Sequence, residues 1–136
     1  MKLILSALAA LLLAGCASMP ADQRLDMYRA NAGATMASFR YYGTIYSWEP
    51  LGDSAVALWT RPAEAYLLEL SGPCNDLEIT RTIGLTDRTG RVYAGFDKVL
   101  VLNQNPVNIP CRIMSIRPLD VASLKQAERD QASSGT

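Results

Sequence analysis

Two closely spaced carboxylates are the best candidates for acid–base chemistry in this 136-residue chain. Asp76 and Glu78 are two positions apart, so on an extended segment both side chains lie on one side and could serve a glycosidic bond as acid and base. A structural role explains them as well, because Asp76 follows a Gly-Pro loop and Glu78 alternates with Leu77 and Ile79. The chain has no histidine, which removes the commonest general base and disfavours serine hydrolase chemistry. We therefore expect no catalytic residues.

Two cysteines in the second half of the chain indicate a disulfide. Cys74 and Cys111 are 37 positions apart, and each follows a proline. A zinc site is disfavoured because the chain has no histidine and no Cys-x-x-Cys motif, and two thiolates alone rarely complete a tetrahedral site. In an oxidising compartment, closing a loop of this length adds about 4 kcal/mol of stability in the chain-entropy model. We expect this bridge and no metal ion or cofactor.

A set of arginine and aromatic side chains forms the candidate binding face. Planar rings and guanidinium groups stack and form hydrogen bonds, so such a face could hold a sugar polymer or a peptide without chemistry. The alternative is a packed core, because a small barrel needs bulky side chains inside. Solvent exposure of Trp48 and Tyr46 separates the two interpretations, since burial of both would exclude a binding face. The set consists of Arg40, Tyr42, Tyr46 and Trp48, which share parity on the first predicted strand, with Trp59, Arg61 and Tyr66 on the following hairpin.

The first sixteen residues have the pattern of an export signal. Lys2 supplies a positive charge, and residues 3–13 form an apolar run that is too short to span a bilayer permanently. The stretch Leu13-Ala14-Gly15-Cys16 resembles the lipobox of bacterial lipoproteins, which implies cleavage before Cys16 and acylation of that cysteine. The alternative is an ordinary secretory signal that carries a cysteine near its cleavage site.

The lipid is expected to provide the membrane affinity of the protein. Two or three acyl chains on Cys16 hold a protein stably, whereas one chain binds only marginally. Ala17 and Ser18 follow the cysteine, and in the Gram-negative lipoproteins that this stretch resembles, the absence of Asp at the first of these positions permits export to the outer membrane. We expect an outer-membrane anchor facing the periplasm. Without Lys2, twelve basic side chains remain beside thirteen acidic ones, a nearly neutral balance that argues against nucleic acid as a partner.

The remaining chain of about 120 residues suits one domain of ordinary size. We expect residues 1–15 to be the cleaved signal peptide and residues 16–20 to be a lipidated tether. A single globular domain over residues 21–130 and a flexible polar tail over residues 131–136 complete the predicted organisation.

Hydrophobic periodicity predicts six strands between two helices. Gly95 is expected to mark a bulge, Pro118 to end the last strand, and Asp120 to cap the second helix. Short strands separated by turn signals indicate an α+β, mostly β fold, in which a small antiparallel sheet curls into a barrel or sandwich with the helices at its edge. The predicted elements are a helix over 20–33, strands over 39–48, 54–60, 65–70, 77–86, 91–102 and 111–117, and a helix that begins at 121.

A series of short motifs spans most of the chain beyond the signal. The motifs are Ser38-Phe39-Arg40-Tyr41, Leu58-Trp59-Thr60-Arg61-Pro62, Glu64-Ala65-Tyr66-Leu67-Leu68, Gly72-Pro73-Cys74, Cys111-Arg112-Ile113 and Ile116-Arg117-Pro118-Leu119-Asp120. In this order they resemble an uncharacterised family of small proteobacterial lipoproteins. The resemblance implies a common scaffold, a single domain, the cysteine pair and an envelope location, and it brings no activity or catalytic residue.

A strong anchor without a catalytic constellation predicts a non-enzymatic envelope lipoprotein. We expect it to bind an envelope protein or peptidoglycan through its sheet while Cys16 holds it at the membrane. The alternative is a small hydrolase of cell-wall glycans, or an inhibitor of such a hydrolase. The hydrolase would require Asp76, Glu78 and Arg40 to converge in one cleft.

Overall fold

The computed structural model describes residues 19–134. The predicted signal peptide and Cys16 lie outside these described residues. Two helices flank a mostly β body, which confirms the predicted α+β class. The elements in chain order are α1 (Ala21–Ala30), β1 (Ser38–Arg40), β2 (Ser47–Pro50), β3 (Ala55–Arg61), β4 (Glu64–Leu70), β5 (Ile83–Leu85), β6 (Arg91–Tyr93), β7 (Lys98–Val101), β8 (Cys111–Leu119) and α2 (Val121–Ser134).

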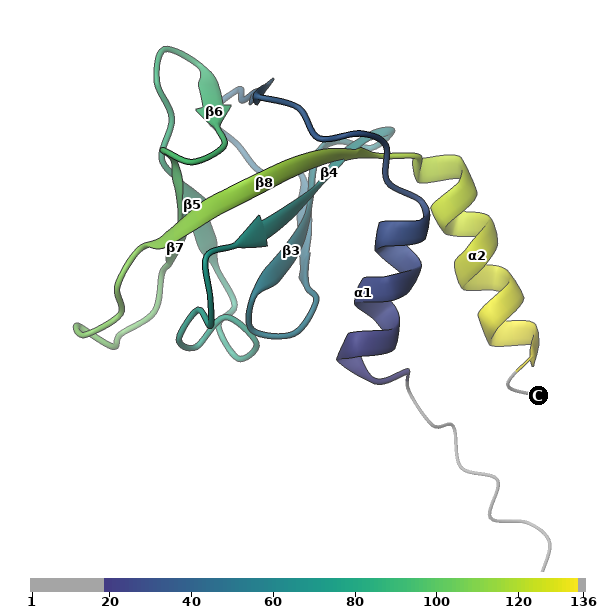
Figure 1. Cartoon of the computed structure of the whole chain (residues 1–136). Coiled ribbons are helices and arrows are strands. Elements are labelled where there is room, and N and C mark those ends of the chain that lie inside the picture. Colours follow the sequence, from purple (N-terminus) through teal and green to yellow (C-terminus); the bar gives the residue numbers. More distant parts are fainter. Residues whose placement is uncertain (1–18, 135–136) are drawn as a thin grey trace, which may run out of the picture.

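Six of the strands form one antiparallel sheet that curves into a half-barrel (Figure 1). The strand order is β2-β3-β4-β8-β7-β5, in which β8 pairs with β4 and with β7. β1 and β6 form a separate two-stranded ribbon at the top of Figure 1. The irregular segment after α1 also joins β8, through the bridges Met36–Ile116 and Ala32–Leu119. Early and late parts of the chain therefore meet along one strand.

β3 and β4 are buried on both faces, because the half-barrel interior covers one face and the helices cover the other. β3 shows the alternation directly, since Val56 and Leu58 join the interior cluster while Ala55 and Ala57 join the cluster on the helix side. Burial on both sides explains why β3 has an uninterrupted apolar run instead of a period-two pattern. The interior cluster includes Phe39, Leu68, Val92, Val99, Ile113 and Ile116, and the helix-side cluster includes Tyr28, Leu67, Leu119 and Leu124.

The second helix begins as the sequence predicts and ends later. Asp120 precedes α2, and its Oδ1 accepts the backbone N–H of Ser123 at 3.0 Å, as an N-cap does. Val121 and Leu124 are the buried residues of this helix, in agreement with their predicted orientation. α2 continues to Ser134, so residues 131–134, expected to be part of a flexible tail, are helical.

The first helix ends earlier than predicted. α1 stops at Ala30, because the side-chain amide of Asn31 donates to the Met27 carbonyl at 2.8 Å and closes the last turn. Gly33, the predicted stop, instead donates its backbone N–H to the Pro118 carbonyl at 2.8 Å. Neither helix within residues 19–134 is long and apolar enough to cross a membrane.

The predicted strands over 39–48 and 77–86 are wrong in extent. The segment 39–48 is divided into β1 and β2 by a turn in which Gly43 has φ 84°, a conformation that favours glycine. In the segment 77–86, only β5 is a strand. The Asp76 carbonyl accepts the backbone N–H groups of Ile79 and Thr80, so this part of the chain is a tight turn. Ile79 is consequently 77% exposed and does not share a buried face.

The predicted extended segment 91–102 is interrupted by a turn between β6 and β7, so the expected bulge at Gly95 is wrong. Gly95 has φ 83°, and the buried Asp97 fixes the turn. Its Oδ2 accepts the Tyr93 backbone N–H at 2.7 Å, and its Oδ1 accepts the Thr86 hydroxyl at 2.8 Å. A carboxylate with these partners holds the turn, a role that the sequence pattern does not show.

The last strand passes through Pro118 instead of ending before it, because the residue lies inside β8 opposite Tyr66 of β4. Nitrogen and carbonyl oxygen of one strand residue point to the same edge, and the Pro118 oxygen accepts from Gly33. The missing N–H therefore faces the irregular segment after α1 and costs no hydrogen bond to β4.

Candidate functional site

Four arginines gather at one end of the half-barrel, which we call the arginine end. The short pairing of β1 with β6 sets Arg40 directly opposite Arg91. Arg61 ends β3 at a register shift, and Arg88 lies in the turn before β6. The β1–β6 ribbon and the β3–β4 turn both lie toward the top of Figure 1, away from the loops that connect β4 to β5 and β7 to β8. These four residues come from separate segments that only the fold brings together.

Tyr42 is the aromatic centre of the arginine end. Its ring is 47% exposed and lies 4.4 Å from the Arg61 guanidinium carbon and 5.7 Å from that of Arg40. A second contact of the same kind joins Arg88 to the Phe96 ring at 5.5 Å. Guanidinium groups stack on aromatic faces through cation–π attraction and keep their N–H donors free for another partner.

Acidic side chains lie close to the arginine end without pairing with its guanidinium groups, since Glu64 is opposite Arg61 in the β3–β4 register and Asp87 precedes Arg88. Within residues 19–134, none of Arg40, Arg61, Arg88 and Arg91 forms an ion pair. Like charges directly opposite one another on paired strands, as Arg40 and Arg91 are, repel each other. An anion bound between these arginines would reduce their repulsion.

Tyr66 forms the inner wall of this end. Its ring stacks on Phe39 with centroids 4.4 Å apart, and its hydroxyl donates to Glu64 Oε1 at 2.9 Å. The same oxygen accepts the Thr60 hydroxyl at 2.9 Å. Burial, followed by the hydrogen bond and charge of Glu64, raises the pKa of Tyr66 to about 12. Glu64 thus binds two hydroxyl groups through this oxygen, and among the described residues it forms no ion pair with Arg61, which lies opposite it on β3.

The rest of the predicted binding face is divided between the two sides of the sheet. Trp48 is partly buried against the interior cluster, whereas Trp59 packs on the helix side, edge-on to Tyr28 at 6.4 Å between centroids. Tyr46 is 62% exposed and borders a small groove with Trp59 and α2. The structure brings Arg40, Tyr42, Arg61 and Tyr66 together, and Trp48 shares a face with Tyr66, from which Leu58 of β3 separates it. Tyr46 and Trp59 lie apart from them, beside α2. Residues of equal parity between 40 and 48 do not share one face, because the chain turns at Gly43 and forms two strands instead of one.

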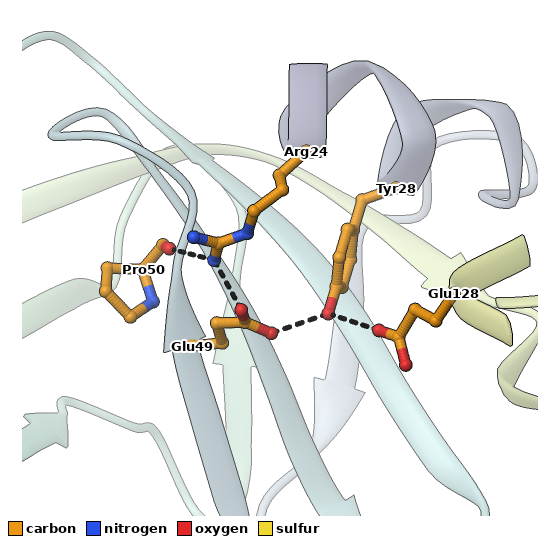
Figure 2. Close-up of polar contacts among 5 residues, drawn as sticks. All are labelled: Arg24, Tyr28, Glu49, Pro50 and Glu128. Atoms are coloured by element: carbon orange, nitrogen blue, oxygen red, sulfur yellow. Dashed lines mark hydrogen bonds and ion pairs between the residues drawn. The ribbon is translucent and has the colours of Figure 1, made fainter. Parts of the chain in front are cut away.

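A polar network that the sequence did not reveal joins both helices to the sheet edge. Figure 2 shows Tyr28 of α1 between Glu49 of β2 and Glu128 of α2. The hydroxyl donates to Glu49 Oε2 at 2.6 Å and lies 3.2 Å from Glu128 Oε1. Arg24 pairs with Glu49 and donates to the Pro50 carbonyl at 2.9 Å.

This network is structural in character. Burial is the main cause that raises the pKa of Tyr28, and the neighbouring carboxylates add to it, so the phenol stays protonated and acts as a donor. Arg24 also occupies the edge of β2, which protects that edge from pairing with another strand. The four-residue spacing of Arg24 and Tyr28 on one helix face was the available signal, but nothing marked Glu49 as their partner.

The two candidate catalytic carboxylates do not form a catalytic pair. The side chains of Asn103 and Asn105 donate to Asp76 Oδ2 at 3.0 and 3.1 Å, and these hydrogen bonds lower the pKa of Asp76. Glu78 is exposed in the adjoining turn. Among the described residues no hydrogen bond or ion pair joins Arg40 to either carboxylate. The prediction that both carboxylates lie on one side required an extended segment, and residues 76–80 form a tight turn instead.

The predicted disulfide is present in the structure. Cys74 and Cys111 are joined with an S–S distance of 2.01 Å and a Cα–Cα distance of 5.7 Å. The bridge connects the loop after β4 to the start of β8. Among residues 19–134, no group of three or more acidic, cysteine or histidine side chains is arranged to hold a metal ion.

Comparison with known proteins gives a family but no activity. Neither a curated protein nor a solved structure matches the chain. A family model, described as a family of unknown function, matches residues 1–135 and so covers nearly the whole chain. The chain therefore belongs to the family of unknown function DUF6491.

Proposed function

We propose that this protein is an outer-membrane lipoprotein that binds a carboxylate-bearing component of the cell wall through its arginine end. The observation that carries the proposal is the exposed Tyr42 ring flanked by Arg61 and Arg40, two guanidinium groups without ion pairs among the described residues. The pattern Leu13-Ala14-Gly15-Cys16 supports the anchor. Acylated Cys16 would hold the protein at the outer membrane, with the domain in the periplasm.

The chemistry of the arginine end fits peptidoglycan as the partner. Its stem peptides carry carboxylates, which guanidinium groups bind through paired hydrogen bonds. Its sugar rings have flat apolar faces that pack on exposed aromatic rings such as Tyr42. Binding of this kind needs neither a nucleophile nor a general base, so the proposed role is that of a non-enzymatic binding protein of the envelope.

Cosedimentation with purified peptidoglycan sacculi tests this proposal. The full-length protein in detergent is mixed with sacculi, and the bound fraction is measured against sacculus concentration. Replacing Arg61 or Arg40 with glutamine removes a charge-assisted contact, so each variant should bind about tenfold more weakly. Chemical amidation of the sacculus carboxylates should weaken binding of the parent protein by a comparable factor.

Arg129→Gln is the matched control, since Arg129 is an exposed arginine of α2 that lies outside the arginine end. This variant should bind sacculi as the parent does. Equal binding by Arg61→Gln, Arg40→Gln and the parent would contradict the assignment of the arginine end. Unchanged binding to amidated sacculi would exclude carboxylates as the recognised group.

A further inference from the structure

The end of the half-barrel opposite the arginine end exposes aliphatic side chains. We call it the loop end, and it consists of the two loops over residues 71–82 and 102–110. Ile79 is 77% exposed and Val107 is 71% exposed, and Leu102 and Ile109 are exposed beside them. The other large hydrophobic side chains exposed among residues 19–134 are three aromatic residues and one methionine. Gathered aliphatic side chains in water are costly and mark a contact surface.

These two loops are held together by covalent and polar links. The disulfide Cys74–Cys111 closes their base. The side chain of Asn75 donates to Asn108 at 2.9 Å, and the Leu102 backbone N–H donates to the Thr82 carbonyl at 3.1 Å. The hydrogen bonds that the Asn103 and Asn105 side chains donate to Asp76 link the loops further. The aliphatic side chains are thus presented on a braced platform.

A groove between the two loops carries unbalanced positive charge. Lys98 and Arg112 lie directly opposite one another on β7 and β8, and both line the groove together with Val107 and Ile109. Neither cation forms an ion pair among the described residues. Apolar side chains next to two free cations match the phosphate and glycerol region of a phospholipid surface.

The proposed anchor would bring this surface to a membrane. Four residues separate Cys16 from the start of α1, and fully extended they span at most about 14 Å. In Figure 1 the first turn of α1 lies toward the same lower side of the molecule as the loops that connect β4 to β5 and β7 to β8. A short tether from that side leaves the loop end facing the bilayer and the arginine end facing away.

We propose that the loop end rests on the phospholipid surface to which Cys16 is anchored, an inference that depends on the lipid anchor proposed above. Ile79, Val107 and Ile109 enter the headgroup region, and Lys98 and Arg112 face lipid phosphates. The domain then has a fixed orientation on the membrane. One end contacts lipid, and the other is free to contact the cell wall.

Quenching by brominated lipid tests this orientation. The full-length protein and its Val107→Trp variant are reconstituted into vesicles of phosphatidylethanolamine and phosphatidylglycerol, with and without bromine on the acyl chains. Bromine should reduce the emission added by the Val107→Trp substitution. Phe96→Trp is the matched control, because Phe96 is 66% exposed in the turn after β6 and lies outside the loop end. Emission added by this substitution should not change.

Each outcome decides one of the two proposals. Equal quenching of both variants, or of neither, overturns the orientation. A blue-shifted but unquenched Val107→Trp signal would show that another protein copy covers the loop end, and would overturn it as well. The mass of the N-terminal peptide is measured on the same sample. An unacylated Cys16 overturns the anchor and the orientation that rests on it, whereas an acylated Cys16 without Val107→Trp quenching overturns the orientation alone.

Discussion

At the arginine end, the exposed side chains are cationic and aromatic, and ring contacts and two short strands hold them. At the loop end, the exposed large hydrophobic side chains are aliphatic, and a disulfide and a cluster of side-chain amides brace the loops that carry them. At the arginine end, the Tyr42 ring contacts its guanidinium groups without a covalent link or an ion pair among the described residues. The loop end has several fixed links within a few residues of one another.

This difference indicates where the molecule needs rigidity. Under the two proposals above, the loop end contacts a fluid bilayer and gains little from adapting to it, whereas the arginine end contacts an irregular polymer and gains from side chains that can reorient. Stability at the loop end is therefore provided by covalent and local polar links, and at the arginine end by packing of Phe39 and Tyr66 beneath the exposed layer. Three substitutions test this contrast.

The largest effect is expected from breaking the disulfide. Cys74→Ser should lower the free energy of unfolding by about 2 to 5 kcal/mol, because the unfolded chain regains the freedom that the bridge removes. Urea unfolding with and without reductant measures the loss. Hydrogen exchange should accelerate first in the loops over 71–82 and 102–110, while the β1–β6 ribbon stays protected.

The matched control for this prediction is reduction of the parent protein. A reducing agent should shift the parent to the midpoint of Cys74→Ser and leave the variant unchanged. Exchange that accelerates equally at both ends would contradict the view that the bridge braces the loop end in particular.

A smaller effect is expected from Tyr66→Phe at the arginine end. Loss of the hydroxyl bond to Glu64 should cost about 1 kcal/mol of unfolding free energy at neutral pH. Because the pKa of Tyr66 is raised to about 12 in the folded protein, its contribution is complete below pH 10 and is lost as the pH rises toward 12. The parent should therefore lose stability relative to the variant over this interval.

Unfolding midpoints of parent and variant between neutral pH and pH 12 provide the measurement. Tyr46→Phe is the control, because Tyr46 is an exposed tyrosine whose hydroxyl forms no hydrogen bond with the described residues. Parallel pH profiles for the parent and Tyr66→Phe would show that ionisation of Tyr66 does not cause the loss of stability at alkaline pH.

The smallest effect is expected from Asp76→Asn at the loop end, and it has the opposite pH dependence. The hydrogen bonds from Asn103 and Asn105 lower the pKa of Asp76, so its contribution is present above the usual aspartate pKa and is lost as the pH falls through the lowered value. In acid, the amides of residues 103–108 should lose protection in the parent, measured as exchange relative to the intrinsic rate at each pH. In Asp76→Asn, the same amides should be less protected at neutral pH and should lose less protection as the pH falls.

Glu78→Gln is the control for the acid measurement, since Glu78 lies in the same turn and is exposed. It should leave exchange of residues 103–108 as it is in the parent at every pH. An Asp76→Asn profile that follows the parent would indicate that other carboxylates open the loop end in acid.

Several features could be predicted from the sequence because they depend on local signals. The β3–β4 hairpin, the Asp87–Gly90 turn and the Asp120 cap follow from residue types within a few positions of one another. The disulfide followed from composition, since two cysteines of the described chain allow one pairing. The fold class followed from the number and length of apolar segments.

The arginine end could be predicted only in part, because it is assembled from separate segments. Arg40, Tyr42, Arg61 and Tyr66 were in the predicted set, but parity along one strand also grouped Tyr46 with them, and Tyr46 lies beside Trp59 and α2. Arg88 and Arg91 were missed because β6 pairs with β1 across about fifty residues of sequence, a register that no local pattern encodes. The turn at Asp76 was missed because alternating apolar residues resemble a strand whether or not they are extended.

The position of β8 sets the order in which this molecule can assemble. β8 joins β4, β7 and the segment after α1, yet it is the last strand to be synthesised. The half-barrel consequently stays open until residues 111–119 have been made and released, so about four fifths of the chain emerges without its closing partner. Export of the kind proposed above would benefit from this delay, because the element that completes the sheet arrives at the end.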